Sequence, residues 1–413
     1  MHRSFSHSTL LIIGILFFII SEGCKPFEKK MLEVHQIDNR KVLVYDIDKI
    51  NETRVIKLSE LVESIEIIRL DNKKYAFLAV TWLQEVSGNY LFFADIQNNL
   101  MVFDKTGNFI SKWEPGRGPS EFILPEHPQI YNNMVFVSDN IRKKLLNYEM
   151  NGKYIKTLDL IKSTGANFVL KDSMILSVGN SESDEDPYLI CIQDFKANIV
   201  KAITSKNHVN ITPALAQEKI IVYPFDMGLN MHFPSNDTLM HYNPEFNHLS
   251  PKAIFYSKTH LEKNKILYEK RLQHGLEITD KQWVQTVKVV PEFETDKYYF
   301  LSIYKYGEKK DLPWYFASRK MCLINKKTNS AFFITVVNDF LGDIPFEFQS
   351  ANQIWGKFII QDFSAIKIKN IFSKIILEKG IEIDLSVKKR LQDFVAGLND
   401  DDNNIVLLYE LKK

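Results

Sequence analysis

The stretch Val102–Phe122, VFDKTGNFISKWEPGRGPSEF, decides the fold, because it joins a tight hairpin turn to an alternating strand. The turn is Asp104–Gly107, DKTG. An Asp at the first position can accept hydrogen bonds from the backbone ahead of it, and a Gly at the fourth position tolerates a positive φ. This chemistry predicts a three-residue loop, closed by a bulge, between two antiparallel strands.

The same turn recurs along the chain. It appears 45 residues later as Glu149–Gly152, and after another 45 residues as Asp194–Ala197. Ala197 replaces the glycine there, so we expect a strained turn. A longer version is expected at Asn325–Ser330. A repeat of this length built from strands is typical of the blades of a β-propeller.

Strand-like runs fill most of the remaining sequence, and we predict an all-β fold, a six-bladed β-propeller over residues 35–413. The first runs are Lys41–Tyr45, Arg54–Leu58 and Ile65–Leu70. The sixth unit is expected to begin with strands at Gln353–Ile360 and Ala365–Ile368.

Two helices are expected to interrupt the strands. One is an insertion at about residues 259–275, rich in Lys, Glu and Leu. The other covers about residues 386–398, where apolar residues recur at helical spacing, with Ser386 as N-cap and Asn399 as stop. The strand Ile405–Tyr409 follows the second helix. We expect it to close the ring by pairing with the first strands, which removes open sheet edges.

Composition excludes some classes of function. The formal net charge of the 413 residues is +1, so a nucleic-acid partner is not expected. The chain has three cysteines, too few and too far apart for a disulfide framework. We predict that Cys191 and Cys322 are buried within strands, and the alternative is a bridge or a reactive thiol.

The N-terminus predicts the cellular address. Leu10–Ile20 is an apolar run of eleven residues, too short to span a bilayer, and Arg3 precedes it. Residues 1–23 are therefore predicted to be a lipoprotein-type signal peptide, with Cys24 as the lipidated first mature residue and residues 24–34 as a tether. Ser21 and Glu22 depart from the usual lipobox, and an ordinary signal peptide or an uncleaved anchor is the alternative.

These elements resemble the six-bladed β-propeller lipoproteins of Bacteroides-type bacteria, which share their architecture with NHL-repeat propellers. The matching segments are VFDKTGNFI, the GRGPSEF loop, Ser235–Leu239, Glu294-Thr295 and the closing run Asp402–Val406, where the family usually has Pro in place of Asn404. The resemblance implies a propeller outside the cytoplasm, anchored by lipid to the cell envelope, and the outer membrane is expected because Lys25 is not the usual inner-membrane retention signal. It implies no activity and no functional residues.

The GRGPSEF loop carries the candidate ligand-binding residues, Arg117 and Glu121. Two Gly and two Pro between Glu114 and Phe122 exclude a helix or a regular strand there. The pair could contact a sugar, a peptide or an anion at the mouth of the propeller. Alternatively, an Arg–Glu pair and backbone bonds only stiffen the loop.

Other polar groups give weaker signals. The acidic run Ser181–Asp186 lacks the Gly and Glu of a calcium loop, and Asp400–Asp402 is likewise expected to be a solvated surface loop. His232 and His241 are expected in adjacent strands, where packing is favoured over a zinc pair. The separation of Asp226 and Glu294 cannot be judged from the sequence. No catalytic residue, metal ligand or cofactor is predicted.

The sequence therefore favours a non-enzymatic, envelope-anchored propeller that binds a ligand or protein partner through loops at one face. A glycan or peptide ligand and an outer-membrane protein are the partners considered. The alternative is a propeller hydrolase or lyase that acts on a glycan or lactone at the central channel, which would need several carboxylates or histidines converging there. A weaker alternative is an assembly partner of an outer-membrane transporter, docked through the helix at 259–275.

Overall fold

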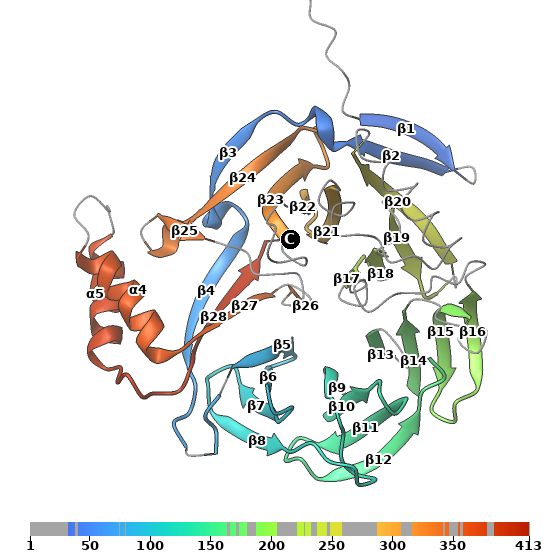
Figure 1. Cartoon of the computed structure of the whole chain (residues 1–413), viewed down its shortest axis with the longest axis horizontal. Coiled ribbons are helices and arrows are strands. Elements are labelled where there is room, and N and C mark those ends of the chain that lie inside the picture. Colours follow the sequence, from blue (N-terminus) through green and yellow to red (C-terminus); the bar gives the residue numbers. More distant parts are fainter. Residues whose placement is uncertain are drawn as a thin grey trace, which may run out of the picture.

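The computed structural model contains a ring of six β-sheets around a centre (Figure 1). It describes residues 32–37, 40–73, 75–78, 80–162, 166–170, 173–179, 187–204, 221–226, 228–232, 238–245, 248–257, 287–306, 316–341, 343–346, 354–355, 358–377 and 384–412. The predicted all-β, six-bladed propeller is confirmed.

Each blade is an antiparallel sheet in which four strands follow one another from the centre of the ring outward. Blade 1 holds β5 (Thr81–Ser87), β6 (Tyr90–Asp95), β7 (Leu100–Asp104) and β8 (Phe109–Trp113); blade 2 holds β9 (Glu126–Tyr131), β10 (Met134–Asp139), β11 (Lys144–Glu149) and β12 (Tyr154–Asp159). Blade 3 holds β13 (Ala166–Leu170), β14 (Met174–Val178), β15 (Tyr188–Asp194) and β16 (Ile199–Thr204); blade 4 holds β17 (Ile221–Phe225), β18 (Gly228–His232), β19 (Thr238–Asn243) and β20 (His248–Tyr256). Blade 5 holds β21 (Val287–Glu294), β22 (Tyr298–Tyr306), β23 (Phe316–Asn325) and β24 (Ala331–Asn338); blade 6 holds β26 (Ile354–Trp355), β27 (Phe358–Phe363), β28 (Ile405–Leu411) and β4 (Val62–Arg69).

The core consists of layers between neighbouring blades. The described residues form six apolar clusters, and each cluster joins the facing sides of two adjacent blades. The second strands β6 and β10 are buried on both faces, which explains their nearly continuous apolar sequences. The fourth strand β8 lies at the rim and alternates between buried and exposed residues.

The N-terminal strands run along the outside of three blades (Figure 1). The hairpin of β1 (Leu32–Ile37) and β2 (Arg40–Asp46) extends blade 4, because β2 pairs in parallel with β20. Next, β3 (Thr53–Lys57) pairs in parallel with β24 of blade 5, and β4 completes blade 6. Three outer edges that would otherwise be open are thus covered by one segment.

The ring closes as predicted, because the C-terminal strand β28 pairs with the N-terminal strand β4. Asn403 secures the junction with blade 1. Its buried side chain accepts from Leu78 N at 3.0 Å and donates to the carbonyls of Asp71 and Ala76 at 2.9 and 2.7 Å. The closing motif noted in the sequence therefore has a structural role.

Two helices, α4 (Ala365–Leu377) and α5 (Leu385–Ala396), lie between β27 and β28, outside the ring (Figure 1). The expectation of a strand at Ala365–Ile368 is wrong. Within four residues, Ala-Ile-Lys-Ile fits either period, but the buried residues of the whole segment recur at helical spacing: Ala365, Ile368, Phe372 and Ile375.

The helix expected near residues 386–398 is confirmed as α5, with a corrected N-cap. Asp384 occupies that position, and its carboxylate accepts from the N–H groups of Ser386 and Val387 at 2.8 and 3.3 Å. Ser386 lies inside the first turn. Hydrogen bonds from its side chain and its N–H to Asp384 lower the pKa of that carboxyl.

The recurring turns connect the third and fourth strands of blades 1, 2 and 3. Gly107 and Gly152 have φ values of +91° and +87°, and each N–H donates to the carbonyl of the first turn residue. Ala197 has a φ of +63°, which confirms the strained third copy. The longer turn at Asn325–Ser330 is also confirmed, with Asn325 N donating to Ser330 O at 2.9 Å.

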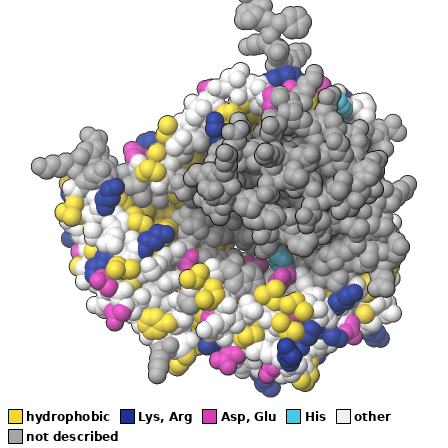
Figure 2. All heavy atoms as spheres, in the orientation of Figure 1, with side chains coloured by type: hydrophobic (Ala, Val, Ile, Leu, Met, Phe, Trp, Pro, Cys, Tyr) yellow, Lys and Arg dark blue, Asp and Glu magenta, His cyan; other side chains and the backbone are white. Residues whose placement is uncertain are grey.

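Several expectations concern other parts of the chain. Cys191 and Cys322 are buried, unbridged and within strands, and burial raises the pKa of Cys322 to about 12. The signal region with Cys24, the acidic run Ser181–Asp186 and the helix expected at 259–275 lie outside the described residues. None of the described helices is long and apolar enough to cross a membrane. On the face drawn in Figure 2, acidic and basic side chains are interspersed over the described surface.

Candidate binding site

The GRGPSEF loop runs from β8 of blade 1 to β9 of blade 2 and folds around Glu121. The Glu121 carboxylate accepts from Gly118 N at 2.7 Å, and Gly116 N donates to Phe122 O at 2.8 Å. A Cβ atom on Gly116 would lie 1.8 Å from Glu121 Oε2, so the glycine permits this close approach.

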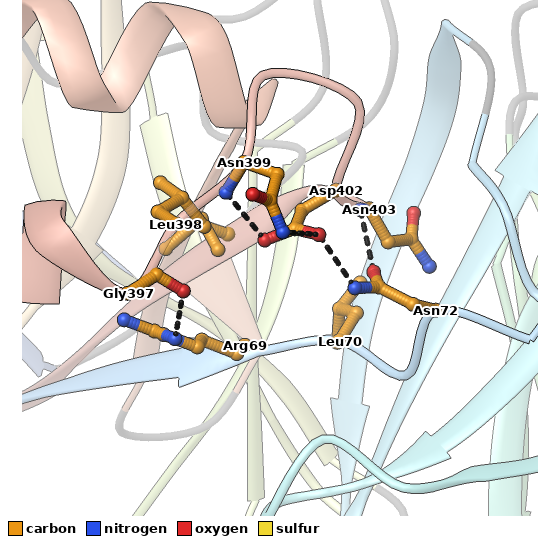
Figure 3. A pocket seen from close by; sticks show the side chains of 9 residues that line it. Arg69, Leu70, Asn72, Gly397, Leu398, Asn399, Asp402 and Asn403 are labelled. Atoms are coloured by element: carbon orange, nitrogen blue, oxygen red, sulfur yellow. Dashed lines mark hydrogen bonds between the residues drawn. The ribbon is translucent and has the colours of Figure 1, made fainter.

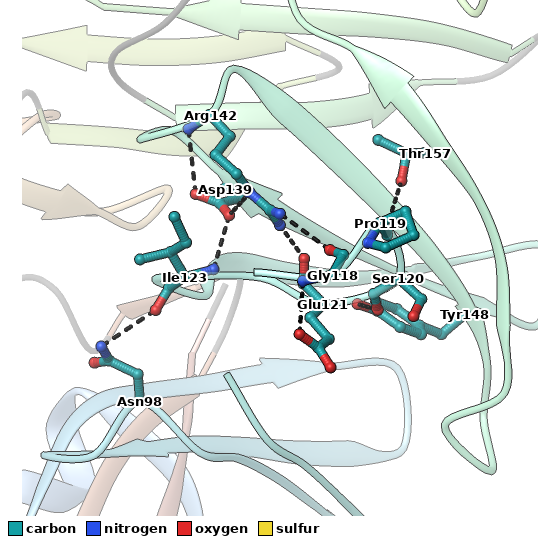
Figure 4. A network of polar contacts seen from close by, with 10 residues as sticks. All are labelled: Asn98, Gly118, Pro119, Ser120, Glu121, Ile123, Asp139, Arg142, Tyr148 and Thr157. Carbon is teal, nitrogen blue, oxygen red and sulfur yellow. Dashed lines mark hydrogen bonds and ion pairs between the residues drawn. The ribbon is translucent and has the colours of Figure 1, made fainter. Parts of the chain in front are cut away.

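Arg142, in the loop between β10 and β11, holds the GRGPSEF loop from outside (Figure 4). Its guanidinium donates to Asp139 Oδ2 at 2.8 Å, to Gly118 O at 3.2 Å and to Glu121 O. The Asp139 side chain is fully buried and also accepts from Ile123 N at 2.8 Å. This network fastens the connection between blades 1 and 2.

The structure does not bring Arg117 and Glu121 together as an ion pair. Arg117 is exposed, and no described residue bonds its guanidinium, whereas the Glu121 carboxylate is used by the backbone of its own loop. Tyr148 and Thr157 of blade 2 donate to the carbonyls of Ser120 and Pro119 as well (Figure 4). The loop is an anchored joint between blades, and a ligand at Arg117 stays a prediction.

A small polar pocket of about 180 Å³ lies where α5 meets the end of β4 (Figure 3). Its groups bind one another. Arg69 donates to the carbonyls of Gly397 and Phe394 at the end of α5, and Asp402 accepts from Asn399 N at 2.9 Å and Asn72 Nδ2 at 2.7 Å. Asp400 and Asp401 are exposed, as expected of a solvated loop, whereas the Asp402 carboxylate fastens the end of α5 to the end of β4.

His232 and His241 lie on adjacent strands but are not opposite each other, since His241 pairs with Asn230. His241 Nδ1 is 2.8 Å from Asn230 Oδ1, and burial lowers the His241 pKa. No group of three possible metal ligands occurs among the residues that the structure places.

A buried ionic cluster joins blades 4 and 5 beside these histidines. The fully buried Glu294 carboxylate binds Lys252 Nζ at 2.6 Å and also pairs with Lys326. Both ammonium groups lie over the Phe225 ring, at 3.8 and 4.4 Å from its centroid. Burial lowers the pKa of Lys252, with Glu294 opposing the shift. The charged groups of the cluster pair with one another and link the two blades.

Glu85 and His127 form a pair on the innermost strands of blades 1 and 2. His127 Nδ1 is 3.5 Å from the buried Glu85 Oε1. His127 has a φ of +46°, an unfavourable backbone conformation for a residue other than glycine. A carboxylate that orients an imidazole is an element of general acid–base sites.

A second pocket, of about 470 Å³, lies in blade 5 and is called here the blade-5 slot. Its lining combines basic, hydroxyl and apolar side chains: Thr53, Arg319, Lys320, Met321, Phe333, Ile334, Thr335, Val336 and Phe346. This volume is within the range of small-molecule and peptide sites.

The slot exists because β24 changes partner along its length. Its first half pairs with β23, up to Ile334 opposite Met321. From Val336 onward it pairs with β25 (Ile344–Phe346). Residues Phe316–Lys320 of β23 therefore have no described partner strand on the β24 side.

The lining of the slot includes residues of both faces of the sheet. A pocket on one face would be lined by alternate residues of each strand, because successive side chains point to opposite faces. Consecutive residues line this one, at 319–321 on β23 and 333–336 on β24. The lining of the slot therefore includes residues whose side chains belong to both faces of the sheet.

Arg319 is held in place at the edge of the slot. Its guanidinium donates to Ser302 Oγ at 2.8 Å and to Glu292 Oε1 at 3.1 Å, and Tyr304 Oη also donates to Glu292 at 2.9 Å. The Glu292 side chain is 1% exposed and Arg319 is 23% exposed. Glu292 lies at a register shift of β21, where a bulge can redirect a side chain.

Sequence reasoning missed the residues of the slot. Arg319, Lys320 and Thr335 lie in segments that look like ordinary strands, and the gap depends on the pairing of β24 with β25. The available signal was Glu292, an acidic residue next to Pro291 in the apolar run VVPEF.

Comparisons with known proteins agree with this fold. A model of the family described as "Domain of unknown function (DUF4934)" matches residues 42–410. Among solved structures, the chain is similar to a presumed exported protein from Bacteroides fragilis, with a TM-score of 0.61 and 18% identity over 87% of this chain and 99% of that one. A member of the DUF4221 family from Bacteroides vulgatus has a TM-score of 0.44 and 12% identity, over 86% and 98%. None of the curated proteins matches.

Proposed function

We propose that this chain, which belongs to the DUF4934 family, is an exported, lipid-anchored propeller that binds a ligand without transforming it. The signal-like N-terminus and Cys24 support export and anchoring, as does the fold shared with a presumed exported protein. The outer membrane is the proposed site of attachment.

The observation that carries the binding function is the blade-5 slot. It offers apolar walls together with a guanidinium that Glu292 and Ser302 hold in place before any ligand arrives. A fixed donor loses little conformational entropy on binding, so it favours recognition. Lys320 adds a second positive charge, and no Asp or Glu occurs among the lining residues that the structure describes. The ligand class that fits is an amphipathic molecule with an anionic group.

A thermal-shift screen tests this function with acidic peptides and acidic glycans as probes. Thr335→Trp fills the slot from an exposed position, and Thr328→Trp places the same side chain in an exposed turn of the same blade. A probe at about 100 times its Kd should stabilise the wild type and Thr328→Trp by roughly 2.7 kcal/mol, but not Thr335→Trp. No shift with any probe, or equal shifts in both variants, contradicts the proposal.

The second candidate is a hydrolase or lyase acting at the central channel, favoured by the Glu85–His127 pair and by the backbone strain at His127. The imidazole would serve as general base, oriented by the carboxylate. Turnover of a glycan or lactone that falls by about 100-fold or more in His127→Asn supports this candidate. Turnover that is unaffected counts against it.

A further inference from the structure

The blade-5 slot lies beside an edge of β23 that pairs with no strand among the described residues, and this edge restricts what can occupy the slot. Both β23 and β25 run antiparallel to β24, so they run parallel to each other. They lie on the same side of β24, because β3 pairs with its other edge. Figure 1 shows β24 leaving β23 and continuing beside β25. In the stretch Phe316–Lys320 of β23, Phe316 and Ser318–Lys320 pair with β22 on one side, and Arg319 and Lys320 line the slot.

We propose that the slot binds an extended acidic peptide of another protein, which adds to β23 as a strand along Phe316–Lys320. This inference rests on the proposed binding function and specifies its ligand. Backbone hydrogen bonds to a free edge give affinity in this mode of recognition, and pockets for alternate side chains give specificity.

The positive charges at the slot indicate that the bound peptide is acidic. Lys320 is exposed and has no ion-pair partner among the described residues; its ammonium lies 5.3 Å from the Phe333 ring centroid. Arg319 already has its carboxylate, Glu292, behind it. A glutamate of the incoming strand would therefore meet Lys320.

The occupant also has apolar residues that alternate with polar ones. Side chains of a strand added at β23 point alternately to the two sheet faces. One face offers Met321, Ile334 and Val336, and the other offers Thr53 and Thr335. An alternating peptide with an acidic residue on the Lys320 side satisfies both faces.

Fluorescence anisotropy with three labelled pentapeptides tests the proposal on the full-length protein. The first alternates valine and threonine around a central glutamate. The second has lysine in place of the glutamate, and the third keeps the glutamate but has alternate backbone amides N-methylated, which removes strand hydrogen-bond donors. We expect saturable binding of the first peptide only.

Two charge-reversal variants complete the test. Lys320→Glu should lower the affinity for the glutamate peptide by about five- to tenfold or more, because an attraction between charges becomes a repulsion. Lys327→Glu makes the same change at an exposed turn of blade 5 outside the slot, and should bind like the wild type.

Any one of four outcomes overturns the inference. The N-methylated peptide binds as well as its parent, the two variants bind equally, or no peptide binds. A dimer that sedimentation detects in the wild type but not in Lys320→Glu also overturns it, because a second copy would then occupy the edge. If acidic glycans still stabilise the protein in a manner that Thr335→Trp abolishes, the binding function stands and only the added strand is wrong.

Discussion

At the residue scale, Gly107 and Ala197 occupy the same position of two copies of one turn, yet they meet different demands. Both have a positive φ, which costs an alanine roughly 1–2 kcal/mol. Gly107 has a second constraint, because a Cβ atom there would lie 1.9 Å from the Arg69 carbonyl oxygen at the end of blade 6. The glycine thus lets one blade contact the backbone of the blade before it.

Exchanging the two residues gives opposite predictions. Gly107→Ala should destabilise the protein by about 3 kcal/mol or more, because it combines backbone strain with a clash against main chain. Ala197→Gly should be neutral or stabilising, by up to about 1 kcal/mol. Urea unfolding followed by circular dichroism measures both. Equal losses in the two variants would contradict this account of the turns.

Local chemistry made these turns predictable from the sequence, whereas the contacts that complete them were not. The Asp104 carboxylate accepts from Thr106 N at 2.8 Å and Asn108 N at 3.0 Å, all within five residues of chain. The approach of Arg69 to Gly107 joins the end of β4 in blade 6 to a turn of blade 1. No pattern within one repeat reports such a contact.

At the element scale, the GRGPSEF loop is fastened by a residue of the next blade. Arg142→Gln should destabilise the protein by roughly 2–4 kcal/mol, because Asp139 remains buried without its cation and two loop carbonyls lose a donor. Arg117→Gln should leave stability within about 0.5 kcal/mol, since the side chain is exposed. Thermal unfolding of both variants provides the comparison.

The same pair of variants tests whether the loop binds a ligand. If a probe that stabilises the wild type loses its effect in Arg117→Gln but not in Thr335→Trp, the loop is the binding site and the blade-5 slot is not. Equal stabilisation of the wild type and Arg117→Gln assigns the loop to structure alone.

Elements with a strong local period were predictable, and elements defined by distant pairing were not. The apolar spacing of α5 extends over a whole helix, so its position was predicted closely. The four residues Ala365–Ile368 were too few to separate helix from strand. The strands β2 and β3 were visible as runs, but their parallel pairing with β20 and β24 joins segments about 200 and 280 residues apart.

At the scale of the whole molecule, buried tyrosines make stability depend on pH. Burial raises the pKa values of Tyr45 and Tyr242 to about 12, and raises those of Tyr148, Tyr299 and Tyr409 further. The folded state then keeps protons that the unfolded chain loses above its ordinary value of 10.0. Their contribution is complete below that value and is lost as the pH rises through the folded pKa values.

The expected result is an unfolding midpoint that falls steeply above about pH 10. Tyrosinate absorbance should rise together with the loss of circular dichroism, because unfolding exposes the hydroxyls. Tyrosinate formation in a protein that keeps its fold would contradict the assignment of these side chains to the core.

The proposed lipid anchor at Cys24 gives a further prediction. Cys24→Ala should abolish incorporation of a labelled lipid precursor, because lipidation requires that thiol. Cys191→Ala is the matched control, since Cys191 is buried in β15, and it should keep the label. Labelling of Cys24→Ala at the wild-type level would show that Cys24 is not the lipidated residue.

The ring of blades was predictable from the sequence, but the blade-5 slot was not. Repeated turns and the closing strand predicted a six-bladed propeller, because each blade repeats the same local pattern. The slot arises where blade 5 departs from that pattern, as β24 exchanges β23 for β25. A departure of this kind depends on backbone pairing between segments whose residue types remain those of ordinary strands.

Amide hydrogen exchange with and without the glutamate-centred pentapeptide is the most direct test of whether a peptide adds to β23 as a strand. We expect amides of Phe316–Lys320 to exchange at least about tenfold more slowly when the peptide is present, because the peptide covers this edge of β23. Amides of the GRGPSEF loop should be unchanged. Slower exchange confined to that loop, or no change in β23 at a saturating peptide concentration, would contradict it.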